Sequence, residues 1–140
     1  MFKVLGVDHI GIAVGDLKEV GSFWGDMLGL LNNGEQTVEE QKVTTGFFPT
    51  PNGSEIELLA ATADDSPIAK FIEKNGGRGG IQHIALRVDD LPAAIADLQE
   101  KGIVMIDKAP RKGAGGADIA FAHPKSTGGV LLEFCQHEDR

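Results

Sequence analysis

The sequence is poor in cysteine, in basic side chains and in long apolar segments, and each shortage excludes a class of protein. One cysteine, Cys135, cannot build an internal disulfide framework, which fits a reducing compartment. The 13 Lys and Arg residues against 21 Asp and Glu give a net charge of -8, which argues against nucleic-acid binding. The chain contains no run of about 18 apolar residues, so no membrane-spanning helix is predicted. The first residues do not have the architecture of a signal peptide. The cytoplasm is therefore the expected location.

An internal repeat is the most informative feature of the chain. Residues 8–17 read DHIGIAVGDL and residues 82–91 read QHIALRVDDL, so His9 and His83 hold the same place in two copies, 74 positions apart. An apolar-Glu-apolar segment follows each copy, with Glu57 48 residues after His9 and Glu133 50 residues after His83. The chain therefore predicts two related modules that each carry one His and one Glu.

The hydrophobic pattern places all four of these residues on strands. In residues 7–14 and 83–88 the aliphatic side chains alternate with the histidine positions, so each His lies on the face opposite the aliphatics. Glu57 and Glu133 alternate with apolar neighbours in the same way. We therefore expect all four side chains on the concave face of a curved sheet whose other face is covered by helices.

Capping residues and glycines mark the helices and the returning strands. The predicted helices follow Asp16 (with Glu19 as a capping-box partner) up to Gly29, follow Ser66 up to about Asn75, and follow Asp90 up to Gly102. The predicted returning strands cover 43–48, 55–60, 119–122 and 130–135. The expected fold is α+β: one domain over 1–140, with βαβββ modules at 1–62 and 80–137, a linker helix within 63–79, and a curved mixed sheet with a metal site in its concavity.

Two imidazoles and two carboxylates together predict a metal site. A lone His on a strand is more often structural, and His123 and His137 are interpreted in that way. Duplication could preserve a structural His, but it would not also place a Glu on the same face of a late strand in both copies. This ligand set suits a divalent first-row ion with positions left open, and the absence of thiolates disfavours a structural zinc site. The predicted ligands are His9, Glu57, His83 and Glu133.

Basic residues offer candidate contacts for an anionic ligand. Four cations fall in one 18-residue window of this acidic chain and could hold phosphates, although a solvated loop is the competing interpretation. They are Lys108, Arg111, Lys112 and Lys125. Arg87 shares the face of His83 and could meet a substrate carboxylate, or it could be a sheet-edge charge. The Gly113–Gly116 run could present N–H groups to an anion, which is weak evidence alone, and Cys135 is interpreted as a packing residue.

These motifs resemble the vicinal oxygen chelate superfamily over nearly the whole chain. The His-Ile-x-x-x-Val-x-Asp-Leu repeats, the paired βαβββ modules and the strand-borne Glu residues carry the resemblance. Four segments resemble the corresponding parts of the methylmalonyl-CoA epimerases of that superfamily. They are residues 66–72, 79–85, 113–116 and 123–133. The resemblance implies that the four predicted ligands hold one divalent ion. It points to cobalt, with manganese, nickel, zinc or magnesium also admissible, and it implies a homodimer.

The epimerase resemblance implies an isomerase that interconverts (2R)- and (2S)-methylmalonyl-CoA by removing and returning the C2 proton. A divalent ion stabilises the resulting enolate charge, and epimerisation needs acid–base groups on opposite faces of the carbon. Glu57 and Glu133 are the candidates, with Arg87, Arg111, Lys112 and Lys125 as candidate contacts of the CoA thioester. Some epimerases carry an acidic base on the preceding strand, where this chain has Thr45, and some carry Gln at the position of Glu57. The identity of the two bases therefore stays open.

Three other functions compete with this interpretation. A glyoxalase I-type lactoylglutathione lyase would act on a glutathione hemithioacetal; Glu57 makes the ligand set similar to that of bacterial glyoxalase I, but this reaction needs no phosphate-binding patch. A ring-cleaving dioxygenase would bind iron through two His and one Glu, so a fourth ligand argues against it. A non-catalytic sequestering protein would not need four metal ligands.

Overall fold

The computed structural model describes residues 1–138, which divide into two compact units. Unit 1 contains Met1–Asp8 and the chain from His83 onward, and unit 2 contains His9–Gln82. The division passes through the two copies of the repeated motif, directly before each of the two histidines. The predicted module boundaries at 1–62 and 80–137 therefore stay a prediction.

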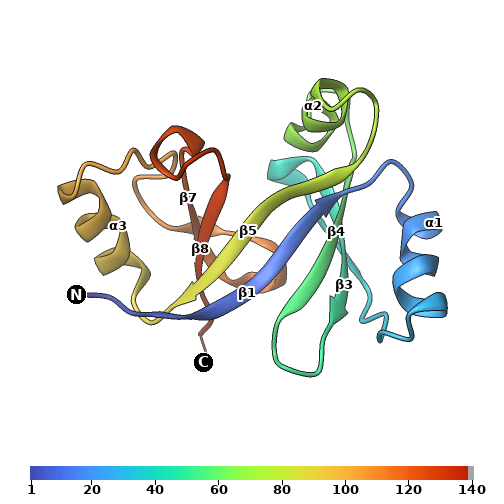
Figure 1. Ribbon diagram of the computed structural model, residues 1–140, viewed down its shortest axis with the longest axis horizontal. Coiled ribbons are helices and arrows are strands. Elements are labelled where there is room, and N and C mark those ends of the chain that lie inside the picture. Colours follow the sequence, from blue (N-terminus) through green and yellow to red (C-terminus); the bar gives the residue numbers. More distant parts are fainter. Residues whose placement is uncertain (139–140) are drawn as a thin grey trace. The chain divides into compact units, whose positions relative to one another are not determined.

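Unit 2 is a four-stranded mixed arrangement with a helix on each face. Its strands lie in the order β2 (Glu35–Val38), β3 (Val43–Pro49), β4 (Glu55–Ala61) and β1 (Val4–Ala13), which belongs to unit 2 from His9 onward. Strands β1 and β4 are parallel, and the other pairs are antiparallel. Phe48 and Leu58 point to the face covered by α1 (Leu17–Ser22). Val43 and Leu59 point to the face covered by α2 (Pro67–Lys74). Figure 1 shows α1 and α2 beside this group of strands.

The first helix departs from the uniform α-helix that the sequence predicts. After α1 the chain continues as a π-helical turn, η1 (Phe23–Met27), and Gly29, with φ of 80°, ends it as predicted. The ring of Phe48 packs beneath Gly21 and Gly25, where an added Cβ would lie 3.4 Å from the ring. Glycine weakens the α-helical preference locally, and the two glycines let the ring approach the helix. Apolar spacing alone does not reveal such a turn.

Unit 1 repeats the same topology. Its strands lie in the order β5 (Gly80–Val88), which belongs to unit 1 from His83 onward, β8 (Leu132–Gln136), β7 (Asp118–Ala122) and β6 (Arg111–Lys112). Strands β5 and β8 are parallel, and the other pairs are antiparallel. The helix α3 (Leu91–Glu100) packs on the face that carries Val88 and Phe134. Figure 1 shows α3 beside β7 and β8. Short 3-10 turns complete the described chain: η2 (Glu39–Gln41), η3 (Ala114–Gly116) and η4 (Pro124–Ser126).

The predicted α+β fold with two βαβββ modules is confirmed. The carboxylates of Asp16 and Asp90 each accept a backbone hydrogen bond at 3.0 Å, from Glu19 and Ala93 respectively, and the Ser66 hydroxyl accepts one from Ile68. The sequence did not locate the second strand of either module, which is β2 in the first and β6 in the second. Over residues 1–138, no helix combines the length and apolar character needed to cross a membrane.

Candidate metal centre

In unit 2 the fold brings His9 and Glu57 into contact. The parallel register of β1 and β4 pairs Gly11 with Glu57, so the glutamate stands two residues beyond the histidine on the neighbouring strand. His9 Nδ1 lies 3.3 Å from Glu57 Oε2, and both side chains are 7% exposed. One imidazole and one carboxylate are therefore buried together at the position that the repeat predicts.

Unit 1 contains the equivalent pair, made by His83 and Glu133. The parallel register of β5 and β8 pairs Ala85 with Glu133, which reproduces the two-residue offset seen in unit 2. His83 Nε2 lies 3.2 Å from Glu133 Oε1, and the side chains are 6% and 5% exposed. The two copies differ in the ring nitrogen that faces the carboxylate. The duplication in sequence is therefore a duplication of a buried His–Glu pair.

The chemistry of these two pairs fits a divalent metal ion. Burying a carboxylate is costly unless it is paired or coordinated, and each glutamate here meets an imidazole nitrogen that can itself be a ligand. Neutral nitrogen and anionic oxygen donors suit first-row divalent ions and magnesium. Cys135 is 1% exposed. Burial, together with the charges of Asp8 and Glu133, raises the pKa of its thiol above the ordinary range.

Thr45 lies on the same face of unit 2 as Glu57. Phe47 of β3 pairs with Glu57, and Thr45 is two residues from Phe47 along the strand, so alternation gives them the same side. Thr45 is 1% exposed. A buried hydroxyl does not act as a proton acceptor at neutral pH in the way that a carboxylate does. Thr45 itself is therefore not a candidate for a general base.

Arg87 belongs to a buried ionic cluster that the sequence did not predict. Its Nε and Nη2 donate to Asp8 Oδ1 at 3.0 and 2.9 Å, and His137 Nε2 lies 2.7 Å from the same oxygen. Asp8 is 4% exposed, whereas the side chains of Arg87 and His137 are 21% and 23% exposed. The one available signal is that Asp8 precedes the first His, where the second copy has Gln82. Binding of a substrate carboxylate by Arg87 stays a prediction.

The predicted phosphate-binding segment contains ion pairs of its own. Arg111 Nε donates to Asp107 Oδ1, and Lys112 Nζ lies next to Asp118 Oδ1, both at 2.8 Å. The hydrogen bond to Asp118 raises the pKa of the exposed Lys112 amine. Lys125 lies in η4, where its N–H donates to His123 Nδ1 at 3.1 Å. Acidic partners therefore offset part of the positive charge that the composition of this segment implies.

The glycine run 113–116 is a packing and turn feature. Gly113 has no room for a side chain, because an added Cβ would lie 2.8 Å from Ile119. Its N–H donates to the Ala117 carbonyl at 2.9 Å, and Gly115 and Gly116 have positive φ values of 74° and 76°. These contacts explain the glycines without an anion.

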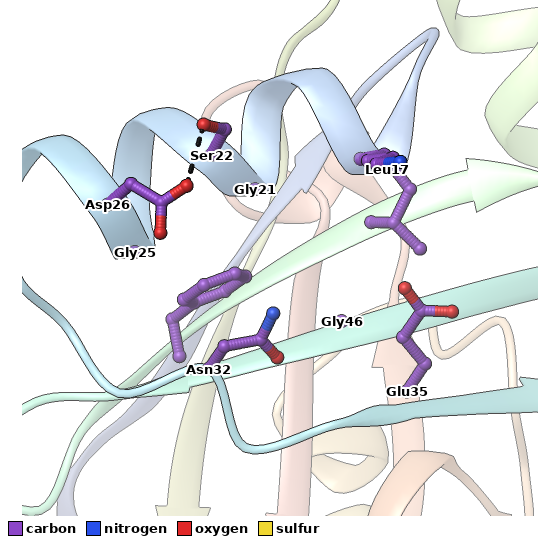
Figure 2. A pocket seen from close by; sticks show the side chains of 10 residues that line it. Leu17, Gly21, Ser22, Gly25, Asp26, Asn32, Glu35 and Gly46 are labelled. Carbon is purple, nitrogen blue, oxygen red and sulfur yellow. Dashed lines mark hydrogen bonds between the residues drawn. The ribbon is translucent and has the colours of Figure 1, made fainter.

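A separate pocket of about 340 Å³ lies on the face of unit 2 that is covered by α1 (Figure 2). It is lined by Gly46 and Phe48 of β3 and by polar side chains that include Asp26 of η1, Asn32, and Glu35 at the start of β2. Phe48 alternates with Phe47, the partner of Glu57, so the pocket and Glu57 lie on opposite faces of the strands. This pocket is not the predicted metal centre.

Comparison with known proteins agrees with this geometry. A family model described as the glyoxalase/bleomycin resistance protein/dioxygenase superfamily matches residues 8–121. The Bacillus subtilis protein YqjC is 42% identical over 130 residues, covering 93% of this chain and 91% of that protein. The ethylmalonyl-CoA/methylmalonyl-CoA epimerase of Cereibacter sphaeroides is 38% identical over 131 residues, covering 93% and 96%.

A solved structure is similar to this chain in both sequence and backbone. It is a methylmalonyl-CoA epimerase in complex with methylmalonyl-CoA and NH4+, 34% identical, with a TM-score of 0.90 over 98% of this chain and 97% of that one. Both the sequence and the backbone therefore match along nearly their full lengths. The chain belongs to the glyoxalase/bleomycin resistance protein/dioxygenase superfamily.

Proposed function

We propose that this protein is an epimerase that interconverts (2R)- and (2S)-methylmalonyl-CoA. The observation that carries the proposal is the pair of buried His–Glu contacts, at 3.3 and 3.2 Å, repeated at the same strand offset in both units. The support from relatives is their activity: one is named an ethylmalonyl-CoA/methylmalonyl-CoA epimerase, and a solved relative holds methylmalonyl-CoA. A superfamily scaffold alone would not define a reaction.

We propose that one divalent ion is held by four side chains, namely His9, Glu57, His83 and Glu133. The resemblance favours cobalt, and manganese, nickel, zinc and magnesium also fit nitrogen and carboxylate donors. When bound, such an ion supplies Lewis-acid stabilisation of negative charge on substrate oxygen atoms. The supporting observation in the chain itself is that each imidazole already has a carboxylate oxygen within 3.3 Å.

The glutamates are the proposed acid–base groups. Inverting C2 requires one group to take the proton from one face and another to return a proton to the opposite face. Glu57 on β4 and Glu133 on β8 come from equivalent strands of the two modules, which makes them a symmetric pair of candidates. Their side chains are 7% and 5% exposed, so both carboxylates are largely shielded from bulk water.

Lysine side chains are the proposed contacts of the CoA phosphates. Lys112 is 73% exposed and its ion pair with Asp118 is at the surface, so the pair contributes little and opens easily. Lys125 is also exposed. Arg87 and Arg111 donate to Asp8 and Asp107, whose side chains are 5% and 15% exposed, so these two arginines are more firmly held. We therefore assign phosphate contact to Lys112 and Lys125 first.

We also propose that the protein forms a homodimer. The aliphatic side chains of Val4, Leu5 and Val7 are 51%, 51% and 44% exposed at the start of β1, and adjacent exposed aliphatics are typical of protein interfaces. Sedimentation velocity would test this, with Leu5→Lys expected to shift a dimer towards monomer. A wild-type protein that sediments as a monomer at all concentrations would refute it.

A side-by-side turnover assay tests the reaction. Purified protein reconstituted with cobalt is given methylmalonyl-CoA in one reaction and the methylglyoxal–glutathione hemithioacetal in another. The proposal expects epimerisation of the thioester and little or no isomerisation of the hemithioacetal. Turnover of the hemithioacetal alone would instead assign the protein to lactoylglutathione lyase chemistry.

A further inference from the structure

His83 touches an aromatic ring as well as a carboxylate. The rings of His83 and Phe121 meet edge to face, with centroids 5.4 Å apart and an interplanar angle of 80°. Phe121 is the β7 partner of Glu133, the residue that contacts His83 Nε2. Two neighbours therefore constrain the same imidazole from different directions, and both belong to unit 1.

Arg111 covers the ring of Phe121. Its guanidinium carbon lies 5.6 Å from the ring centroid, within the range of a cation–π contact. Arg111 is on β6, and its neighbour Lys112 pairs with Asp118 instead. Phe121 therefore contacts a guanidinium as well as the imidazole of His83, and these contacts restrict rotation of its ring.

Asp107 accepts hydrogen bonds from both Arg111 and Phe121. Its Oδ1 accepts from Arg111 Nε at 2.8 Å, and its Oδ2 accepts from the backbone N–H of Phe121 at 2.9 Å. The Phe121 carbonyl accepts in turn from the N–H of Ile106 at 2.8 Å. The side chain of Asp107 is 15% exposed and that of Arg111 is 41% exposed. Both hydrogen bonds involve an ionised carboxylate, which makes them stronger than hydrogen bonds between neutral groups. One carboxylate thus holds the backbone of Phe121 and the cation over its ring.

We propose that Asp107 and Arg111 are positioning residues for His83 and act through Phe121. A histidine ligand works only when its ring is fixed in one orientation, and the groups that surround it set that orientation and change metal affinity. In this chain the carboxylate of Glu133 fixes one ring atom, and the Asp107–Arg111–Phe121 series fixes the plane of the ring. The inference deepens the proposed function, because it concerns how one proposed metal ligand is held.

This role differs from the phosphate contact that the sequence suggested for Arg111. A phosphate contact acts only when the CoA nucleotide is present. A positioning contact acts on the His83 ring in the protein alone, before any metal or substrate binds. The two roles are therefore separated by a measurement on the metal-free protein.

The test compares Arg111→Met with Lys112→Met. Both variants remove one positive charge from β6, but only Arg111 stacks on Phe121. Phe121→Leu is the third variant, because it removes the ring and keeps an apolar side chain. The imidazole resonances of His83, one of four histidines, are assigned by their loss in His83→Gln. Spectra are recorded on metal-free protein, and affinity for Co²⁺ is then measured by calorimetry, with thermal unfolding as the check on folding.

We expect Phe121→Leu and Arg111→Met to shift the His83 ring resonances and to weaken Co²⁺ binding by about tenfold or more, while Lys112→Met changes neither. Arg111→Lys, which keeps a cation beside the ring, should recover part of the affinity. His83 resonances and Co²⁺ affinity that are the same in Arg111→Met and Lys112→Met would overturn the inference. If the wild type bound no Co²⁺, the proposed metal site would fail, while the spectra of metal-free protein would still decide the positioning role.

Discussion

At the scale of single residues, the proposed chemistry depends on carboxylates that are both buried and in contact with imidazole. Glu57 and Glu133 meet that condition, whereas Thr45, buried on the strand next to Glu57, cannot carry a negative charge. Epimerisation needs two acid–base groups, and the two glutamates are therefore the candidates for both of them. Because both glutamates are proposed as metal ligand and as base, variants at these positions are the most informative ones.

Glu133→Gln should reduce kcat by about 10²–10⁴-fold, since that is the usual contribution of one acid–base group. The assay uses saturating metal, because the amide also binds an ion more weakly than the carboxylate does. Glu57→Gln should have a milder effect, because some related enzymes carry Gln at that position. A severe loss in Glu57→Gln would instead identify Glu57 as the second base. An unchanged kcat in Glu133→Gln would contradict the role of Glu133.

Cys135 should be chemically inert in the folded protein. It is 1% exposed, and burial with the nearby charges of Asp8 and Glu133 raises the pKa of its thiol, so very little thiolate forms at neutral or mildly alkaline pH. A thiol-specific chromogenic reagent at pH 8 should react only after denaturation, which serves as the control for one thiol per chain. Rapid reaction of the native protein would show that the thiol is not buried in this way.

At the scale of elements, local signals identified the helix starts and most of the strands. The short strands β2 and β6 were not identified, because they depend on pairing with another strand. Asp16, Ser66 and Asp90 marked the helix N-termini because each offers an oxygen to an unpaired backbone N–H. Strand β6 has two residues and is defined by its partner β7 rather than by any hydrophobic pattern. Such elements have no signal in a window of sequence, since the energy that forms them comes from distant residues.

In the candidate site, too, local sequence patterns predicted some residues, and contacts between distant residues were missed. Alternation and repetition predicted the four His and Glu residues, because both follow from the order of residues along a strand. The cluster around Asp8 was not predicted, since it joins residues 79 and 129 positions away in the sequence. The contact of Phe121 with His83 was missed for the same reason, because an aromatic residue on a strand gives no sign of which ring it will meet.

Asp90→Ala tests the assignment of the cap at α3. The Asp90 carboxylate accepts a hydrogen bond from the Ala93 N–H at 3.0 Å, and its loss should lower the free energy of unfolding by about 1 kcal/mol. Asp64→Ala, in an exposed turn, is the matched control and should change stability by less than about 0.5 kcal/mol. Urea unfolding followed by circular dichroism measures both. Equal stability of the two variants would show that the cap contributes nothing.

At the scale of the whole molecule, an acidic protein must accept a highly anionic substrate. The net charge of -8 repels CoA at long range, so the binding of its phosphates requires local cations. The exposed Lys112 and Lys125 are the proposed source of that local attraction.

The double variant Lys112→Gln, Lys125→Gln should raise KM for methylmalonyl-CoA. The expected rise in KM is about tenfold or more for each contact removed, because a charge-assisted hydrogen bond contributes about 1.5–3 kcal/mol. The matching thioester of pantetheine, which lacks the nucleotide phosphates, should be affected far less. An equal rise in KM for both substrates would contradict phosphate binding by these lysines.

Exchange of the C2 proton with solvent tests the central claim most directly. A proton removed by one glutamate and returned by another, with exchange against water between the two events, must label the substrate. In D₂O, metal-loaded protein should introduce deuterium at C2 of methylmalonyl-CoA as the two epimers interconvert, and chelation of the metal should abolish the labelling. Absence of deuterium at C2 with folded protein and any of the admissible ions would contradict the account.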